Sequence, residues 1–328
     1  MMLLSIEEAV RLIGKNEILH IAGSEDSLAK LPKGKWIGGT IPYFMTELGG
    51  LVAEEKVFVT GLSEYSGNVE IVTYDEGHLK NVLRDAPENG FTIIIIPAFS
   101  RCHISYAENA PNYEDMFMKP IIGWISGVHL DDLGKTTPKT FNGETGEKSG
   151  EKAIAMHVSL PPNKFAEIGI INILEPGQGD TLQFETEGFS VKDCLVNGLK
   201  TNFADYLVSN RIDAKLPLVA NFSGSMVNVS IREINNPEKI VHLYAPVFLH
   251  TDYHIAQPVS DYVTEFMTRL SSEEIFPVFS CNCILNYLYS KLEGKKTGHL
   301  TGPMTFGEIA YQLLNQTLVY LEVKEVQG

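Results

Sequence analysis

HLTGPMTFGEIAYQLL, residues 299–314, is the stretch of this sequence that most constrains the fold. It sets Gly302 and Gly307 on either side of the apolar residues Met304 and Phe306, and it places a carboxylate, Glu308, directly after the second glycine. Glycine within a strand pattern marks a bend or a place that another group approaches closely. The stretch therefore predicts a glycine corner at the end of a strand, which either closes a sheet or forms one wall of a binding site.

Two other stretches repeat this order of residues. WIGGTIPYF (36–44) and IIGWISGV (121–128) each run from apolar residues through glycine to a further apolar segment. Because glycine lets backbone and neighbouring groups come close together, we expect several sheets to end at such corners.

The rest of the chain predicts strands and helices in an interspersed order. Ser5 and Glu8 form a capping box, which predicts an opening helix. FTIIIIPAF (91–99) is apolar without alternation, which predicts a strand buried on both faces. Hairpin turns are frequent, and strands do not alternate strictly with helices. We therefore expect an α/β fold: a layered α/β sandwich with mixed or largely antiparallel sheets rather than a doubly wound parallel sheet.

Two further predictions concern residues 190–210 and the pair Cys102-His103. Apolar residues at helical spacing between positions 190 and 210 predict a helix-rich stretch, which the pair Asn197-Gly198 breaks in two. Cys102 and His103 are predicted to lie on a strand with their side chains on opposite faces. We therefore expect a buried cysteine beside a surface histidine, and no nucleophile–base pair.

Composition excludes several classes of partner. The chain has 328 residues, with 26 Lys and Arg against 41 Asp and Glu and a net charge of −15. Binding to nucleic acid or to an anionic membrane surface requires clustered positive charge, so we expect neither. The longest apolar run is far shorter than a membrane span, and the N-terminus lacks the basic start of a signal peptide. We expect a cytoplasmic protein.

The sequence holds few motifs of known chemistry. It has no nucleophile elbow of the form GxSxG, no phosphate-binding GxxxxGK[ST] loop and no CxxC pair. Cys283 is predicted to lie near a helix N-terminus, where the pKa of a thiol can fall. An enzyme of unknown reaction that uses Cys283 is therefore one hypothesis, and packing in the core is the other.

The segments FSCNCIL (279–285) and GPMTFGEI (302–309), followed by a closing strand, resemble the C-terminal part of the FIST family of bacterial sensory proteins. Residues 305–309 match the family's signature around Gly-Glu-Ile, whereas Pro303 and Met304 depart from it. Many members carry an arginine shortly after the cysteine, and this chain has none there, which leaves open what kind of ligand is bound. In order and spacing, the likeness covers nearly the whole chain.

The resemblance implies two related or interlocking halves, a FIST-N-like half at 1–185 and a FIST-C-like half at 186–328. It also implies a non-catalytic module that binds a small molecule and signals through a separate partner, such as a histidine kinase or a cyclic-di-nucleotide enzyme. Some members are hemoproteins that sense nitric oxide. The alternative function is therefore a heme-based sensor, whose axial ligand would be His157 or His242.

The candidate ligand-binding residues lie at the glycine corners and near the cysteine. Their backbone groups and apolar side chains would enclose the ligand: Gly38, Gly39, Thr40, Gly123, Trp124, Asn282, Cys283, Met304, Thr305, Phe306, Gly307 and Glu308. For Glu308 two roles are open. It either anchors an amine of the ligand or accepts hydrogen bonds from exposed backbone amides at the corner. We predict no catalytic residue, no metal ligand and no cofactor other than the alternative heme.

Overall fold

Strands dominate the computed structural model of the chain, which describes residues 1–65, 67–222, 225–270 and 274–326. Within these ranges the strands form five mostly antiparallel sheets, and three strand pairs are parallel: β2–β3, β8–β9 and β23–β24. The prediction of an α/β fold with mixed, largely antiparallel sheets is confirmed. The last two residues of the predicted second half, 327 and 328, lie outside the described residues.

The first sheet is built from the N-terminal part of the chain. Its strand order is β1 (Met2–Ser5), β6 (Lys56–Gly61), β2 (Leu19–Gly23), β3 (Trp36–Thr40), β10 (Thr140–Asn142) and β11 (Lys148–Ser149). The helices α1 (Ile6–Gly14) and α2 (Glu25–Leu28) pack on its outer face. The predicted capping box is present at α1, because Glu8 N donates to Ser5 Oγ and Ser5 N donates to Glu8 Oε2.

The second sheet joins the middle of the chain to its end. Its order is β26 (Gln312–Leu314), β25 (Glu308–Ala310), β9 (Ile121–Ser126), β8 (Gly90–Pro97), β12 (Ala153–Ser159) and β7 (Val69–Tyr74). Its outer face carries the helix α3 (Arg101–Asn109) and the short 3-10 helices η1 (Leu79–Asn81) and η2 (Ala110–Asn112).

The third sheet also mixes early and late segments. Its order is β13 (Lys164–Ile171), β27 (Leu318–Glu325), β23 (Phe279–Cys283), β24 (Gly302–Thr305), β4 (Tyr43–Thr46) and β5 (Gly49–Val52). The helices α5 (Tyr262–Leu270) and α6 (Ile284–Tyr289) accompany it, and η3 (Leu130–Asp132) follows β9. In the described part of the chain, no helix is long and apolar enough to cross a membrane.

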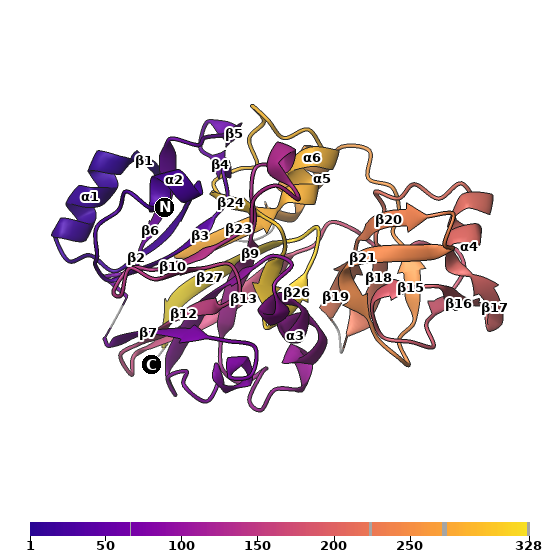
Figure 1. The fold of residues 1–328 in the computed structure, drawn as a ribbon, viewed down its shortest axis with the longest axis horizontal. Coiled ribbons are helices and arrows are strands. Elements are labelled where there is room, and N and C mark those ends of the chain that lie inside the picture. Colours follow the sequence, from indigo (N-terminus) through magenta and orange to yellow (C-terminus); the bar gives the residue numbers. More distant parts are fainter. Residues whose placement is uncertain (66, 223–224, 271–273, 327–328) are drawn as a thin grey trace.

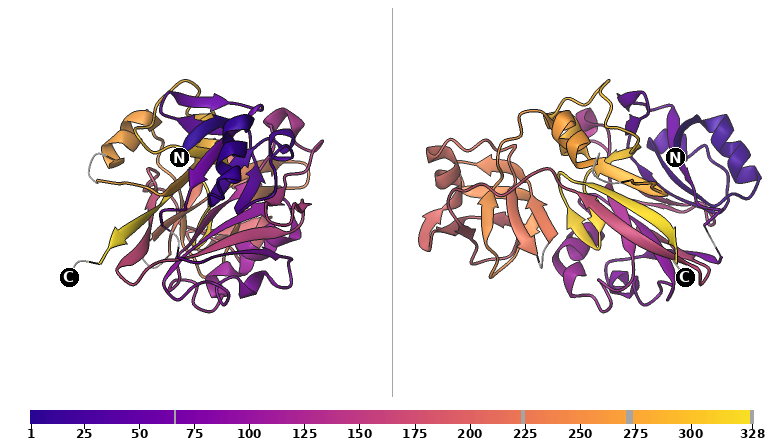
Figure 2. Two further views of the ribbon diagram at one scale, coloured as in Figure 1. Left: turned by 90° about the vertical axis from the view of Figure 1, so that its left-hand side faces the viewer. Right: turned by 180° about the vertical axis from the view of Figure 1, so that it is seen from behind.

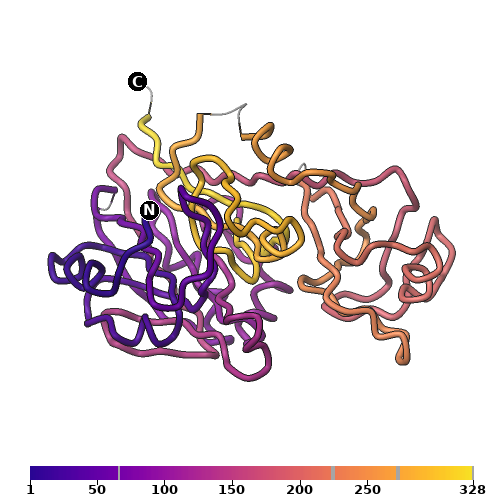
Figure 3. Tube along the Cα trace, turned by 90° about the horizontal axis from the view of Figure 1, so that it is seen from above, coloured from indigo at the N-terminus to yellow at the C-terminus, as the bar shows by residue number. Residues whose placement is uncertain are grey.

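The remaining two sheets form a smaller unit on one side of the molecule, set off in Figure 1, in the right-hand view of Figure 2 and in Figure 3. One has the order β17 (Leu199–Asn202), β16 (Asp193–Val196), β14 (Leu182–Gln183), β22 (Tyr253–Ile255), β18 (Leu218–Phe222) and β19 (Ser225–Val229). The other has β15 (Gly188–Val191), β21 (Ile240–Val247) and β20 (Ile231–Asn235), with α4 (Phe203–Ser209) alongside.

The chain enters and leaves this small unit at one place. Pro176 and Ala256 form an antiparallel bridge, and Gln257 N donates to Glu175 O over 2.8 Å. The unit is thus an insertion between β13 and α5, and it contributes no strand to the first three sheets. We call the first three sheets with their helices the main body.

The core of the main body lies between the sheets, and β8 shows how it is divided. Ile93 and Ile95 belong to a cluster that also holds buried residues of the first and third sheets. Ile94 and Ile96 point the other way, into a second cluster with α3 and the small unit. The prediction of a strand buried on both faces is confirmed, because each face of β8 meets a separate apolar layer.

Two local predictions are wrong. The stretch 190–210 forms the strands β15, β16 and β17 before a short α4, since Asn197 and Gly198 both have positive φ and make a hairpin turn between β16 and β17. Cys102 and His103 lie on α3 and not on a strand, because Ser100 caps that helix by accepting a hydrogen bond from His103 N. Both side chains are buried.

Gly39 offers a test of how the first two sheets pack. A Cβ at this position would lie 2.6 Å from Ile95 and 2.7 Å from Trp124, so the contact between the sheets depends on its absence. We expect Gly39→Ala to lower the free energy of unfolding by about 1–3 kcal/mol in urea titrations, because the core would be overpacked. Gly61→Ala, where a Cβ meets nothing within 4 Å, is the control and should stay within about 0.5 kcal/mol of wild type. Equal effects would contradict this account.

Candidate functional site

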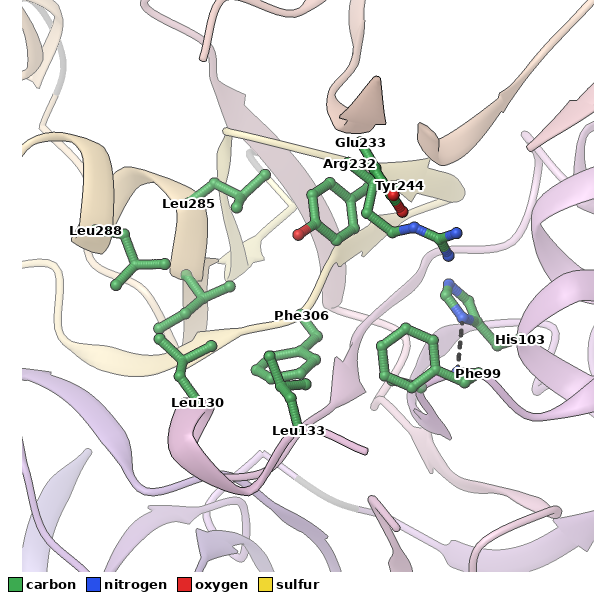
Figure 4. A pocket seen from close by; sticks show the side chains of 12 residues that line it. Phe99, His103, Leu130, Leu133, Arg232, Glu233, Tyr244, Leu285, Leu288 and Phe306 are labelled. Atoms are coloured by element: carbon green, nitrogen blue, oxygen red, sulfur yellow. Dashed lines mark hydrogen bonds between the residues drawn. The ribbon is translucent and has the colours of Figure 1, made fainter. Parts of the chain in front are cut away.

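A cavity of about 380 Å³ opens where the main body meets the small unit (Figure 4). The cavity is lined largely by apolar side chains: Leu130, Leu133, Ile284, Leu285, Leu288 and Phe306. Phe99 and Ala98 complete the apolar part, and four polar side chains are added by His103, Arg232, Glu233 and Tyr244. A concave, mostly apolar space with a few polar groups has the form of a small-molecule site.

The location follows from the strand directions. β8, β9 and β23 each belong to a parallel pair, and the segments that follow their carboxyl ends supply Phe99, Leu130 and Ile284 to the cavity. In α/β folds, ligand sites form outside the carboxyl ends of parallel strands, where the chain turns away to a helix or loop. The β20–β21 hairpin of the small unit contributes Arg232, Glu233 and Tyr244 to the lining.

Of the five residues in the corner TFGEI, Phe306 is the one that lines the cavity. Phe306 N donates to Ile125 O over 3.1 Å, which fixes this position beside β9. Gly127 leaves room for the ring, since a Cβ there would lie 2.3 Å from it. Phe99 packs against Phe306 edge to face at 6.5 Å between ring centroids. The corner therefore presents an aromatic side chain to the cavity.

His103 is a buried donor at one end of the cavity. Its Nδ1 accepts a hydrogen bond from Phe99 N over 3.2 Å, so in the neutral ring Nε2 carries the proton. Nε2 is buried and has no hydrogen-bond partner among the described residues. Burial lowers the pKa of His103 to about 4, which keeps the ring uncharged near neutral pH.

Arg232 comes from a bulge in β20. The pairing of β20 with β21 shifts its register between Ile231 and Glu233, and Arg232 is the extra residue. Bulges of this kind redirect a side chain, and here Arg232 reaches the cavity. Arg232 forms no ion pair with any carboxylate in the described ranges.

The cavity is also lined by four residues that are not among the candidates predicted from the sequence: Phe99, His103, Arg232 and Tyr244. For His103 a signal was present, because Ser100 stands at the position of a helix N-cap three residues before it. For Arg232 the bulge leaves no mark in the sequence, since bulges depend on strand pairing. Tyr244 reaches the cavity through the same pair of strands.

Glu308 lies in the interior, fully buried. Its Oε2 accepts from Thr317 N at 3.2 Å and from Thr317 Oγ1 at 2.9 Å, and its Oε1 lies 3.3 Å from Thr305 Oγ1. Burial raises the pKa of Glu308 to about 8, although the hydrogen bonds from Thr317 and from the Cys283 thiol oppose this. Glu308 thus holds the buried backbone amide of Thr317, between β26 and β27, and not an exposed amide of the corner itself; both predicted roles stay predictions.

Most other candidate residues gather around Glu308 in the interior. β9 pairs with β25 so that Trp124 faces Glu308, and Cys283 pairs with Thr305 between β23 and β24. Trp124 Nε1 donates to His20 Nε2 over 2.7 Å, and burial lowers the pKa of His20 to about 3. The buried candidates of this group do not line the cavity: Gly123, Trp124, Asn282, Cys283, Met304, Thr305, Gly307 and Glu308.

The remaining candidates lie along β3. Gly38 and Gly39 are both closely packed. A Cβ at position 38 would lie 3.1 Å from Ile21 O, and one at position 39 would lie 2.6 Å from the Ile95 side chain. Thr40 lies at the end of β3, where its Oγ1 accepts a hydrogen bond from Lys139 N and its carbonyl accepts one from Gly127 N. Thr40 lines a second, polar cavity on the surface of the main body. A ligand-binding role of these residues stays a prediction.

Of the two candidate heme ligands, His157 already has both ring nitrogens in hydrogen bonds, and for His242 the role stays a prediction. His157 is buried, and both of its ring nitrogens already hold hydrogen bonds, Nε2 with the Tyr74 hydroxyl at 2.9 Å and Nδ1 with Thr92 Oγ1 at 2.8 Å. Burial lowers its pKa to about 4. His242 lies on β21 with Nδ1 2.8 Å from Ser190 Oγ, and it is not among the residues that line the cavity. His157 therefore does not fit an axial ligand.

The thiol of Cys283 is poorly suited to nucleophilic chemistry. It is fully buried, and burial together with the nearby Glu308 raises its pKa well above the usual value. The other three cysteines are also buried free thiols.

This burial predicts slow labelling of the cysteines. In concentrated guanidinium chloride all four thiols should react with a disulfide reagent. Over the same time near neutral pH, we expect no thiol of the native protein to react. Rapid labelling of Cys283 in the native protein would contradict this prediction.

Glu308 predicts a pH dependence of stability. The pKa of this carboxyl group is higher in the folded protein than in the unfolded chain. Its contribution to stability is therefore complete at a pH below the pKa of the unfolded chain, and it is lost as the pH rises toward the pKa of the folded protein. Between pH 4.5 and about 8, wild type should therefore lose stability relative to Glu308→Gln, by up to about 1.4 kcal/mol per pH unit. Urea titrations across this range measure the difference, with the exposed Glu55→Gln as control. Parallel curves for wild type and Glu308→Gln would refute it.

Comparison with known proteins gives a family but no relative of known function. No curated protein and no solved structure matches the chain significantly. A family model described as a family of unknown function, DUF6976, matches residues 4–324, which is nearly the whole chain. The protein belongs to the DUF6976 family.

Proposed function

We propose that the protein is a non-catalytic module that binds a small molecule in the cavity around Phe306 and signals through a separate partner. The observation that carries this proposal is the composition of the cavity: an apolar wall with a buried, unpaired donor on His103 and a cation on Arg232 that has no ion pair in the described ranges. Unpaired buried donors are costly, and a ligand that accepts from them would recover that cost.

The family resemblance supports the same location. Phe306 belongs to the TFGEI corner, the segment that most resembles the FIST family, and it lines the cavity. Residues on both sides of the proposed division at 185/186 surround the same space, with Phe99 from one half and Leu285 from the other. Strand pairs such as β9–β25 and β13–β27 cross this division, as two interlocking halves would require.

The arrangement also favours signalling. The cavity takes residues from the main body and from the β20–β21 hairpin of the small unit, so a ligand would contact both. A ligand that binds one arrangement of two units more tightly shifts the population toward it. A change in this arrangement would alter the surface formed by the two units, and a histidine kinase or a cyclic-di-nucleotide enzyme would recognise the altered surface.

The residue at the turn between β8 and α3 favours binding over catalysis at this site. The chain passes from β8 into α3 through Phe99, which has φ 65, a strained conformation for a non-glycine residue. A nucleophile elbow sets its serine or cysteine at such a strand-to-helix turn. Here the position holds a phenylalanine, which gives the ligand an apolar contact and no nucleophile.

Filling the cavity tests the proposal. Leu288 lines the cavity and is 38% exposed, so the variant Leu288→Trp should fold, with the indole ring filling the cavity. The matched control is Leu48→Trp, at a position outside the cavity that is 80% exposed. We expect a metabolite library to contain a compound that raises the melting temperature of wild type and of Leu48→Trp but not of Leu288→Trp. A ligand present at 100 times its Kd stabilises by about 2.7 kcal/mol. Stabilisation that persists in Leu288→Trp, or none at all, would refute the site.

A further inference from the structure

The polar end of the cavity holds two hydrogen-bond donors, His103 Nε2 and the Arg232 guanidinium, and His103 Nε2 has no acceptor among the described residues. Figure 4 shows the His103 ring with one nitrogen bound to Phe99 and the other nitrogen turned toward the Arg232 guanidinium. The nitrogen turned toward Arg232 is Nε2, which carries the proton and has no partner in the described part of the chain. Both groups line this end of the cavity as hydrogen-bond donors, so neither can satisfy the other.

The same end of the cavity is favourable for negative charge. Arg232 contributes a fixed positive charge, since a guanidinium does not lose its proton in proteins. The N-terminus of α3, a helix of nine residues, opens beside Phe99 and His103, and its dipole adds partial positive charge. Arg232 has an exposed side chain, so it can turn to admit a ligand atom between itself and His103.

The rest of the lining limits what that ligand can be. Glu233 stands next to Arg232 and lines the same cavity, so a ligand with two negative charges would meet repulsion. The protein's net charge of −15 also repels a doubly negative ligand at longer range. Beyond the polar end, the wall is formed by leucines and Phe306, which favour an apolar chain or ring.

We propose that the cavity binds a monocarboxylic acid with an apolar body, whose carboxylate accepts hydrogen bonds from His103 Nε2 and Arg232 and whose tail lies against Leu130, Leu285 and Phe306. This inference rests on the proposed function and names the ligand class of that site. An oxygen of the carboxylate is the acceptor that both donors lack, and a bond from a charged guanidinium to a carboxylate is among the stronger hydrogen bonds.

Three ligands with the same eight-carbon tail test the carboxylate by calorimetric titration: octanoate and octyl phosphate below their critical micelle concentrations, and 1-octanol below its solubility limit. We expect octanoate to bind wild type about ten- to a hundred-fold more tightly than 1-octanol, as a charge-assisted hydrogen bond predicts. Octyl phosphate should bind more weakly than octanoate because of Glu233. Equal affinity for octanoate and 1-octanol would overturn the inference.

Variants at the polar end test the residues. Arg232→Leu should abolish the preference for octanoate over 1-octanol and leave 1-octanol affinity unchanged, whereas Arg84→Leu, at an exposed site away from the cavity, should keep the preference. His103 is buried, so His103→Leu is paired with His103→Gln, which keeps an N–H donor, and both are checked by circular dichroism. A loss of affinity for both ligands alike in Arg232→Leu would contradict carboxylate recognition.

The outcomes separate this inference from the proposed function. If octanoate and 1-octanol bind equally and Leu288→Trp blocks both, the site stands and the carboxylate inference fails. If the eight-carbon ligands fail to bind but a library compound is lost in Leu288→Trp, the ligand class is wrong and the site again stands. If no compound depends on the cavity, both fail.

Discussion

The pairing of β25 with β9 is the interaction on which the rest of the structure depends. Through it, a segment near the end of the chain becomes part of a sheet built from the middle, with Glu308 opposite Trp124. The strand that follows β25 after a hairpin, β26, extends the same sheet, and β27 then crosses to the third sheet. If this pairing were absent, Phe306 would not be held beside Ile125, and the cavity would lose its aromatic wall.

The same pairing explains why a carboxylate is buried at the centre. Glu308 accepts from the Thr317 backbone amide, at the point where the chain turns from β26 into β27. A neutral Glu308 can also donate to Thr305 Oγ1, whose own proton has the Gly307 carbonyl as acceptor. A protonated carboxyl thus ties β24 and β25 to the turn that precedes β27 by bonds that an apolar side chain could not make, which is how buried polar groups specify one arrangement of layers.

The sequence predicted features that depend on neighbouring residues and failed where distant ones decide. The capping box of Ser5 and the continuous apolar run of β8 are local, and both were predicted correctly. The stretch 190–210 has helical spacing, but strand pairing and the Asn197-Gly198 turn outweigh it. At the site, Phe306 could be found because glycines flank it. Arg232 could not, because its orientation comes from a bulge whose partner strand begins several residues later.

The small unit between β13 and α5 has a consequence for how this architecture can vary. Its two ends meet at the bridge between Pro176 and Ala256, and none of its strands belongs to the three sheets of the main body. A chain with this unit shortened, enlarged or replaced by a brief turn would keep every strand pair of the main body. Such a change would alter the side of the cavity that carries Arg232 and Tyr244 and the apolar layer that the unit shares with α3, so ligand preference can diverge while the strand pairing of the main body stays constant.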